Sequence, residues 1–139
     1  MTQPSYAEDY IAISRVKAQY CRFVDSKDWA GYTSLFTEDA EFDCVPGSPP
    51  IVGRETFVAD TRSFIDPAQT AHHVHSPEID VDGDVANVIW AMQDRVIGAA
   101  KLAEKAHTGY GHYRERYVRE NGRWRIARLQ LRYVVYETE

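Results

Sequence analysis

The residues best suited to transfer protons are one aspartate at the end of a helical pattern and three histidines that lie close together later in the chain. Asp25 follows an apolar stripe with helical spacing, and His72, His73 and His75 stand in a segment rich in strand-forming residues. A histidine titrates near neutral pH and can take a proton from carbon, while a carboxylate beside it fixes its tautomer and stabilises the imidazolium. Asp25 and one of these histidines therefore form a candidate proton-transfer pair.

Geometry limits which of these side chains can meet. Tyr20, whose hydroxyl could polarise a carbonyl, lies five residues before Asp25. At about 100° per residue the two positions differ by about 140° around an ideal helix, so both reach one cavity only if the helix ends there. Neighbours in a strand alternate faces, so His72 points one way while His73 and His75 point the other. Only one of these two sets can line a pocket.

The same residues also have ordinary structural interpretations. An aspartate after a helix often caps the next helix, and a histidine in a strand is often half-buried without a chemical role. His73 and His75 share a strand face, but no third ligand stands at a spacing typical of a metal site, so we expect no metal. His107 and His112 are expected on a strand face or at the surface.

The elements that must position these residues change character halfway along the chain. Ser5 and Glu8 form a capping box that predicts a helix start, and Asp66-Pro67 ends the helical half. Asp82-Gly83 and Asn121-Gly122 are typical hairpin turns between segments rich in Val, Ile, Tyr and Trp. The pattern predicts helices over residues 5–25, 28–36 and 54–65, a short strand over 40–45, long strands over 70–81, 85–97, 109–120 and 123–136, and a loop that can hold one helical turn over 98–107.

This order favours one α+β domain over residues 1–139, with the helices packed on one face of a long antiparallel sheet. Strands of this length must curve. A curved sheet capped by helices leaves a concavity, and a concavity lined by aromatic side chains is the usual site for a small ligand.

Composition excludes several classes of protein. The chain is 44% hydrophobic and 27% charged with a net charge of −5, and its basic residues are scattered, so we expect no nucleic-acid partner. No apolar run approaches the roughly 20 residues that span a bilayer, so we expect no membrane insertion. The first residues lack the features of a signal peptide, which favours a cytoplasmic location. Cys21 and Cys44 suit two reduced thiols.

Short segments spread along nearly the whole chain recur together in one known group of proteins. They are Tyr20–Asp25, Leu35–Phe42, Ile51–Arg54, Thr70–His73, Asp82–Ala86 and Tyr117–Ile126. In order and spacing they resemble the SnoaL-like branch of the nuclear transport factor 2-like superfamily, which includes scytalone dehydratase, bile-acid dehydratase and hexachlorocyclohexane dehydrochlorinase. The resemblance implies a cone-shaped fold with three N-terminal helices on a strongly curved antiparallel sheet that encloses a pocket.

The resemblance also implies roles for particular residues. An aspartate at the end of the first helix orients a basic histidine in that group, and these positions look like Asp25 and His72. Tyr20 lies where related dehydratases place a polar pocket residue. Ser76 stands where the family commonly has Asn, and a register slip of one residue would turn His73 inward instead.

Further positions resemble the substrate wall of the family. They are Tyr113, Leu129 and His73. With them, the resemblance implies a cofactor-independent lyase of the dehydratase type, or an isomerase of the ketosteroid-isomerase type, acting on a small cyclic, mostly apolar substrate. The alternative is a non-catalytic small-molecule-binding or scaffold protein with the same fold. A homodimer or homotrimer is expected, and exposure of Trp90 or Trp124 on the outer sheet face would favour such association.

Overall fold

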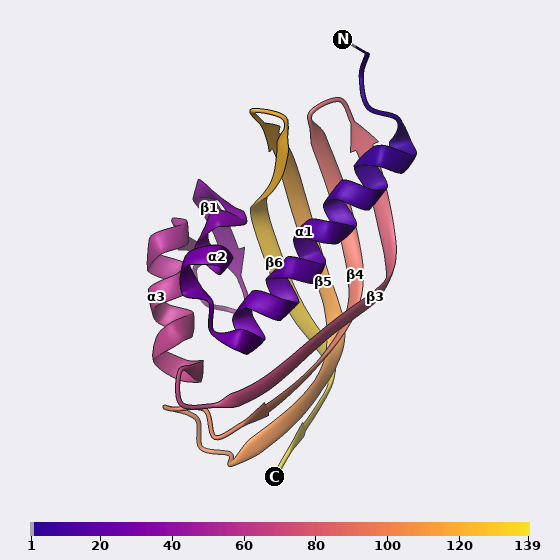
Figure 1. Ribbon diagram of the computed structural model, residues 1–139. Coiled ribbons are helices and arrows are strands. Elements are labelled where there is room, and N and C mark those ends of the chain that lie inside the picture. Colours follow the sequence, from indigo (N-terminus) through magenta and orange to yellow (C-terminus); the bar gives the residue numbers. More distant parts are fainter. Residues whose placement is uncertain (1) are drawn as a thin grey trace.

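Three helices lie along one face of a six-stranded, strongly curved sheet in the computed structural model, which describes residues 2–139 (Figure 1). The order of strands across the sheet is β2-β1-β6-β5-β4-β3. The elements are α1 (Tyr6–Ser26), α2 (Trp29–Ser34), β1 (Phe36–Asp43), β2 (Ile51–Val52), α3 (Arg54–Ile65), β3 (Gln69–Asp82), β4 (Val85–Ile97), β5 (Ala106–Glu120) and β6 (Arg123–Thr138). The expected α+β class and the expected fold are confirmed.

The first helix begins and ends where the sequence predicts. The Glu8 backbone N–H donates to Ser5 Oγ over 3.2 Å, and the Ser5 N–H donates to the Glu8 carboxylate over 2.6 Å, which completes the capping box. Lys27, with φ of 60°, adopts the left-handed conformation and ends the helix. Because α1 crosses the concave face of the sheet beside β3, its last turn brings Asp25 against that strand (Figure 1).

The second helix is shorter than predicted, and the strand after it is longer. Phe36 begins β1 because it pairs in parallel with Ile126 of β6, and the Ile126 N–H donates to the Leu35 carbonyl over 2.8 Å. The sheet is therefore mixed: β1 pairs with β6 in parallel, and the expected antiparallel pairing holds for the other neighbouring strands. The two-residue strand β2 was not predicted either; it pairs with β1 alone.

The remaining elements follow the sequence pattern closely. The third helix and β4 have the predicted bounds, and both hairpin turns lie where predicted. β5 begins at Ala106, three residues earlier than predicted, because Ala106 and His107 pair with the end of β4. The segment 98–105 is a loop without a helix, closed by a hydrogen bond from the Gly98 N–H to the Lys105 carbonyl over 2.9 Å.

An irregularity in β3 changes which side chains face the helices. His72 and Val74 point toward the helical side, whereas His73 and His75 are exposed. The register then shifts between His75 and Glu78, where Ser76 has φ of 48°, and beyond the shift the odd-numbered Ile79 is buried. The side-chain phase of the strand thus reverses after the histidines and leaves His72 inward.

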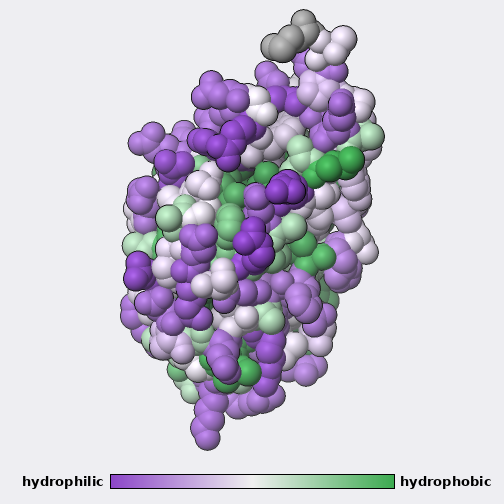
Figure 2. Space-filling model, in the orientation of Figure 1, coloured by the Kyte–Doolittle hydropathy of each residue, from purple (hydrophilic) through white to green (hydrophobic). Residues whose placement is uncertain are grey.

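The core is rich in aromatic side chains. Phe42 stacks on Phe57 with ring centroids 3.7 Å apart, and Tyr32 packs edge-on against Phe36 at 5.1 Å. Trp90 and Trp124 are both buried in this core, so neither is an exposed anchor for association. Figure 2 shows hydrophobic side chains only in separate groups among hydrophilic ones on the face it displays. No helix of residues 2–139 is long and apolar enough to cross a membrane.

Candidate active site

Asp25 and His72 form a close pair at the point where α1 ends against β3. Asp25 Oδ1 lies 2.7 Å from His72 Nδ1, and Asp25 Oδ2 accepts the His72 backbone N–H over 2.8 Å. The Thr70 hydroxyl donates to Asp25 Oδ1 over 2.8 Å. A carboxylate can only accept hydrogen bonds, so Nδ1 carries a proton and Nε2 presents its lone pair. The Asp25 carboxylate therefore fixes both the position and the tautomer of the imidazole.

The surroundings of Asp25 favour its charged form. Burial acts to raise the pKa of this carboxyl, but the hydrogen bonds from the ring and backbone of His72 and from Thr70 outweigh it and hold the pKa below its ordinary value. The side chains of His72 and Asp25 are only 13% and 26% exposed. Asp25 is thus an anion at neutral pH, ready to stabilise an imidazolium.

This lowered pKa predicts a dependence of stability on pH. The unfolded chain binds a proton at Asp25 more readily than the folded protein, so the contribution of this carboxylate is complete above its ordinary pKa of about 4 and is lost as the pH falls through the lower folded value. The difference in unfolding free energy between the wild type and Asp25→Asn should shrink as the pH is lowered below about 4. Urea unfolding at a series of pH values measures it. Thr70→Val removes one donor but keeps the carboxylate, so its difference in unfolding free energy from the wild type should shrink less over the same pH range. A difference between wild type and Asp25→Asn that does not vary with pH would contradict the prediction.

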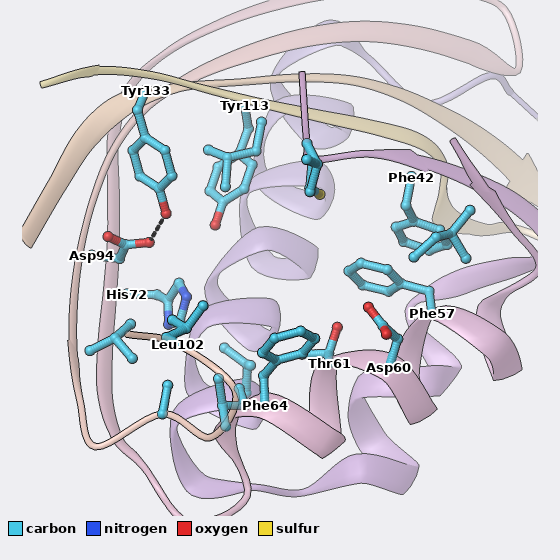
Figure 3. Close-up of a pocket in the computed structure, with 18 of the residues that line it drawn as sticks. Phe42, Phe57, Asp60, Thr61, Phe64, His72, Asp94, Leu102, Tyr113 and Tyr133 are labelled. Carbon is cyan, nitrogen blue, oxygen red and sulfur yellow. Dashed lines mark hydrogen bonds between the residues drawn. The ribbon is translucent and has the colours of Figure 1, made fainter. Parts of the chain in front are cut away.

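A cavity of about 370 Å³ opens beside His72 between the concave face of the sheet, the end of α1, α3 and the 98–105 loop. Most of its wall is apolar. Its side chains include Val24, Phe42, Phe57, Phe64, Val96 and Leu131. In Figure 3 His72 and Asp94 lie on one side of the cavity, and Phe42 and Phe57 lie on the other. A volume of this size suits a one- or two-ring organic molecule.

Two tyrosines that the sequence singled out line this cavity together. Tyr20 on α1 and Tyr113 on β5 are both buried, with ring centroids 5.7 Å apart. Burial raises the pKa of both phenols well above the ordinary value, so both remain protonated and can donate hydrogen bonds. Tyr20 lines the cavity itself, whereas Asp25 contacts His72 at the end of α1 and is not among the residues of the cavity wall.

A buried ion pair lies against these tyrosines. Lys17 Nζ stands 2.6 Å from Glu115 Oε2, and neither side chain is exposed. The ammonium also lies 3.5 Å from the ring centroid of Tyr20 and 3.6 Å from that of Tyr113. Burial lowers the pKa of Lys17, and the nearby Glu115 carboxylate opposes that shift. The Lys17 ammonium thus contacts both rings and helps to hold Tyr20 and Tyr113 in place.

Two of the expected substrate-wall residues lie elsewhere. His73 is exposed on the opposite side of β3 from His72, because the strand keeps its alternation up to His75. Leu129 is fully buried in the core, and Leu131, two residues further along the same strand, lines the cavity instead. The structure therefore corrects the expectations for His73 and Leu129.

Three polar cavity residues on neighbouring strands were not predicted. Asp94 on β4, His107 on β5 and Tyr133 on β6 all line the cavity and are mutually close. His107 was expected at the surface or on a strand face, and it lies buried on the face of β5 that lines the cavity. The even-numbered alternation of β4 places Asp94 among apolar inward positions, and this was the available signal. Among residues 2–139 no three His, Cys, Asp or Glu side chains are grouped so as to hold a metal ion.

The chain is similar to several known proteins. A SnoaL-like domain is matched over residues 5–130. A protein of Gibberella zeae named a probable cyclase is 27% identical over 131 residues, which cover 86% of this chain and 87% of that protein. A solved structure of a protein of unknown function from Mycobacterium tuberculosis is 28% identical, with a TM-score of 0.77 over 90% of this chain and 71% of that one.

Two further solved structures share the fold at lower identity. One, from Novosphingobium aromaticivorans and provisionally named a scytalone dehydratase, is 24% identical with a TM-score of 0.80, over 94% of this chain and 87% of that one. The other is a hexachlorocyclohexane dehydrochlorinase from Novosphingobium barchaimii, 18% identical with a TM-score of 0.80, over 94% of this chain and 90% of that one. The family match covers nearly the whole length, and the chain therefore belongs to the SnoaL-like domain family.

Proposed function

We propose that this protein is a cofactor-independent enzyme that removes a proton from carbon in a small cyclic, mostly apolar substrate and so drives an elimination of the dehydratase type or an isomerisation. The observation that carries the proposal is the Asp25–His72 pair, whose free Nε2 is left facing an apolar cavity of about 370 Å³. A base held in one tautomer beside a largely apolar cavity is well placed to take a proton from carbon in a bound substrate.

The proposed step assigns a role to each group. His72 Nε2 takes a proton from the carbon next to a substrate carbonyl, and Asp25 stabilises the resulting imidazolium. The electron pair of the broken C–H bond forms an enolate. In a dehydration that pair becomes the new C=C bond as the C–O bond to the β-hydroxyl breaks, and the hydroxyl takes the proton from the His72 imidazolium and leaves as water; in an isomerisation the imidazolium returns the proton to another carbon. Tyr20 and Tyr113 donate hydrogen bonds to the carbonyl oxygen as negative charge develops there.

The relatives support this class of chemistry without fixing the substrate. Their names include a cyclase, a scytalone dehydratase and a hexachlorocyclohexane dehydrochlorinase. At these identities the similarity to the solved structures supports the fold alone, so the proposed reaction depends on the residues of this chain.

Two assays on ketones of suitable size test the proposal. With α-tetralone in heavy water, we expect the protein to accelerate exchange of the protons next to the carbonyl, measured by proton NMR. With a tetralone bearing a hydroxyl β to the carbonyl, we expect loss of water to give a naphthol, measured by absorbance. Exchange without loss of water would favour an isomerase. If the ketones bind measurably but neither reaction is faster than without the protein, the non-catalytic alternative would be favoured.

A further inference from the structure

The side of the cavity next to His72 carries a polar corner that the proposed proton abstraction does not use. Asp94 and His107 form it, only 3% and 6% exposed, together with the Tyr133 hydroxyl. Asp94 is the direct partner of His72 in the pairing of β3 with β4. The corner therefore lies beside the carbon from which His72 would take a proton, and Figure 3 shows Asp94, Tyr133 and His72 on the same side of the cavity.

The two oxygens of Asp94 have different surroundings. Tyr133 donates its hydroxyl to Oδ2, whereas Oδ1 has no hydrogen-bond partner within residues 2–139. This arrangement needs a glycine at position 109, since a Cβ there would overlap the Tyr133 ring and lie 2.7 Å from Asp94 Oδ1. The backbone of β5 thus leaves room for Tyr133 to hold Oδ2, while Oδ1 lies beside Gly109 and His107.

Neighbouring side chains also hold the ring of His107 in place. Its ring stacks on Tyr136 with centroids 4.6 Å apart, and Nδ1 lies 3.7 Å from a Glu104 oxygen that accepts the Tyr136 hydroxyl over 2.6 Å. Its Nε2 lies 3.6 Å from Asp94 Oδ1, beyond the length of a direct hydrogen bond. In the described chain neither ring nitrogen of His107 has a hydrogen-bond partner.

A buried acceptor and a buried donor therefore stand side by side without partners. Such groups are rare in native proteins and call for an explanation, one of which is a bound molecule that completes the hydrogen bonding. An oxygen placed about 2.8 Å from both atoms would form a triangle with their 3.6 Å separation. A hydroxyl group fits this position because it donates one hydrogen bond and accepts others.

We infer that Asp94 and His107 form a subsite for a substrate hydroxyl, which donates to Asp94 Oδ1 and accepts from His107 Nε2–H. As a statement about substrate class it rests on the proposed function, because it places the hydroxyl close to the reacting carbon. A chlorine substituent cannot donate to a carboxylate, so the subsite selects hydroxylated ring compounds over halogenated ones. Sites built to bind a substrate hydroxyl reject analogues that lack it strongly, because their own polar groups are then left unpaired.

Binding of three matched probes to the unaltered protein tests the inference. They are β-tetralol, its chloro analogue and the parent hydrocarbon tetralin, with dissociation constants measured by ligand-detected NMR. We expect the alcohol to bind at least about tenfold more tightly than either of the others. Affinities within about twofold of each other for the three probes would overturn the inference.

Substitutions in the subsite test whether the preference for the alcohol arises there. Asp94→Leu combined with Tyr133→Phe removes the carboxylate together with its hydroxyl partner, and His107→Phe removes the donor. Each should weaken alcohol binding about tenfold and leave tetralin binding unchanged; an alcohol preference that survives in both folded variants would overturn the inference. If either variant does not fold, the comparison on the unaltered protein still decides.

A variant of the proposed base separates this inference from the proposed reaction. His72→Ala should lose turnover and keep the preference for the alcohol, because the subsite lies on β4 and β5. Loss of the preference in this variant would count against the subsite. Proton exchange by the unaltered protein that does not depend on His72 would count against the proposed reaction alone.

Discussion

The His72→Ala variant is expected to lower kcat for loss of water from the β-hydroxylated tetralone by about 10²- to 10⁴-fold, the range that a positioned general base contributes. The variant lacks the ring nitrogen that takes the proton, and no other histidine of residues 2–139 forms a hydrogen bond to Asp25. Asp25→Asn should lower kcat at least about tenfold, because it removes the charge that stabilises the imidazolium and lets the ring adopt the other tautomer. Steady-state kinetics with circular dichroism as a check on folding measure both effects.

The matched control is His73→Ala. This side chain has the same chemistry one residue along the strand but is exposed on the other side of β3. It should leave kcat unchanged. A large loss in His73→Ala, or an unchanged rate in His72→Ala, would show that the wrong histidine has been assigned as the base.

The second large effect concerns stability, and it arises from the buried Lys17–Glu115 pair. Lys17→Met would leave the Glu115 carboxylate buried without its cationic partner, which should cost about 3–5 kcal/mol of unfolding free energy. Adding Glu115→Gln should recover part of this loss, since it removes the unpaired charge while the amide oxygen can still accept the Tyr117 hydroxyl. Urea unfolding of the single and double variants measures the coupling.

A surface ion pair provides the control. Arg62 Nε lies 3.6 Å from Asp66 Oδ2 with both side chains about half exposed, so Arg62→Met should cost no more than about 1 kcal/mol. Equal losses in Arg62→Met and Lys17→Met, or a double variant less stable than Lys17→Met, would contradict the account of the buried pair.

Local patterns were sufficient to predict the ends of α1 and α3 and most strand bounds. The capping box fixed the start of α1, and the turns at Asp82-Gly83 and Asn121-Gly122 fixed both hairpins, because these signals act within a few residues. The expectation that Asp25 lies at the end of a helix followed from the same kind of signal. Alternation separated His72 from its neighbours, and the family resemblance chose between the two faces.

What could not be predicted depends on pairing between distant segments. The parallel pairing of β1 with β6 has no local signature, and neither has the register shift near Ser76. Asp94, His107 and Tyr133 meet only because the registers of three strands place them together. Leu129 and Leu131 stand two residues apart within one continuous stretch of pairing with β5, so the alternation of β6 gives no sign that one lies in the core and the other in the cavity wall.

The place of β6 in the sheet has a consequence for the order of events during folding. This strand follows β5 in the sequence, yet it lies between β1 and β5, and it supplies Leu131 and Tyr133 to the cavity wall. The hairpin of β3 and β4 joins neighbours in the sequence, whereas the parallel pairing of β1 with β6 joins segments more than 80 residues apart. Such non-local pairings are slow to form and leave apolar surface uncovered in the meantime. The wall of the cavity is therefore complete only after β6 has paired between β1 and β5.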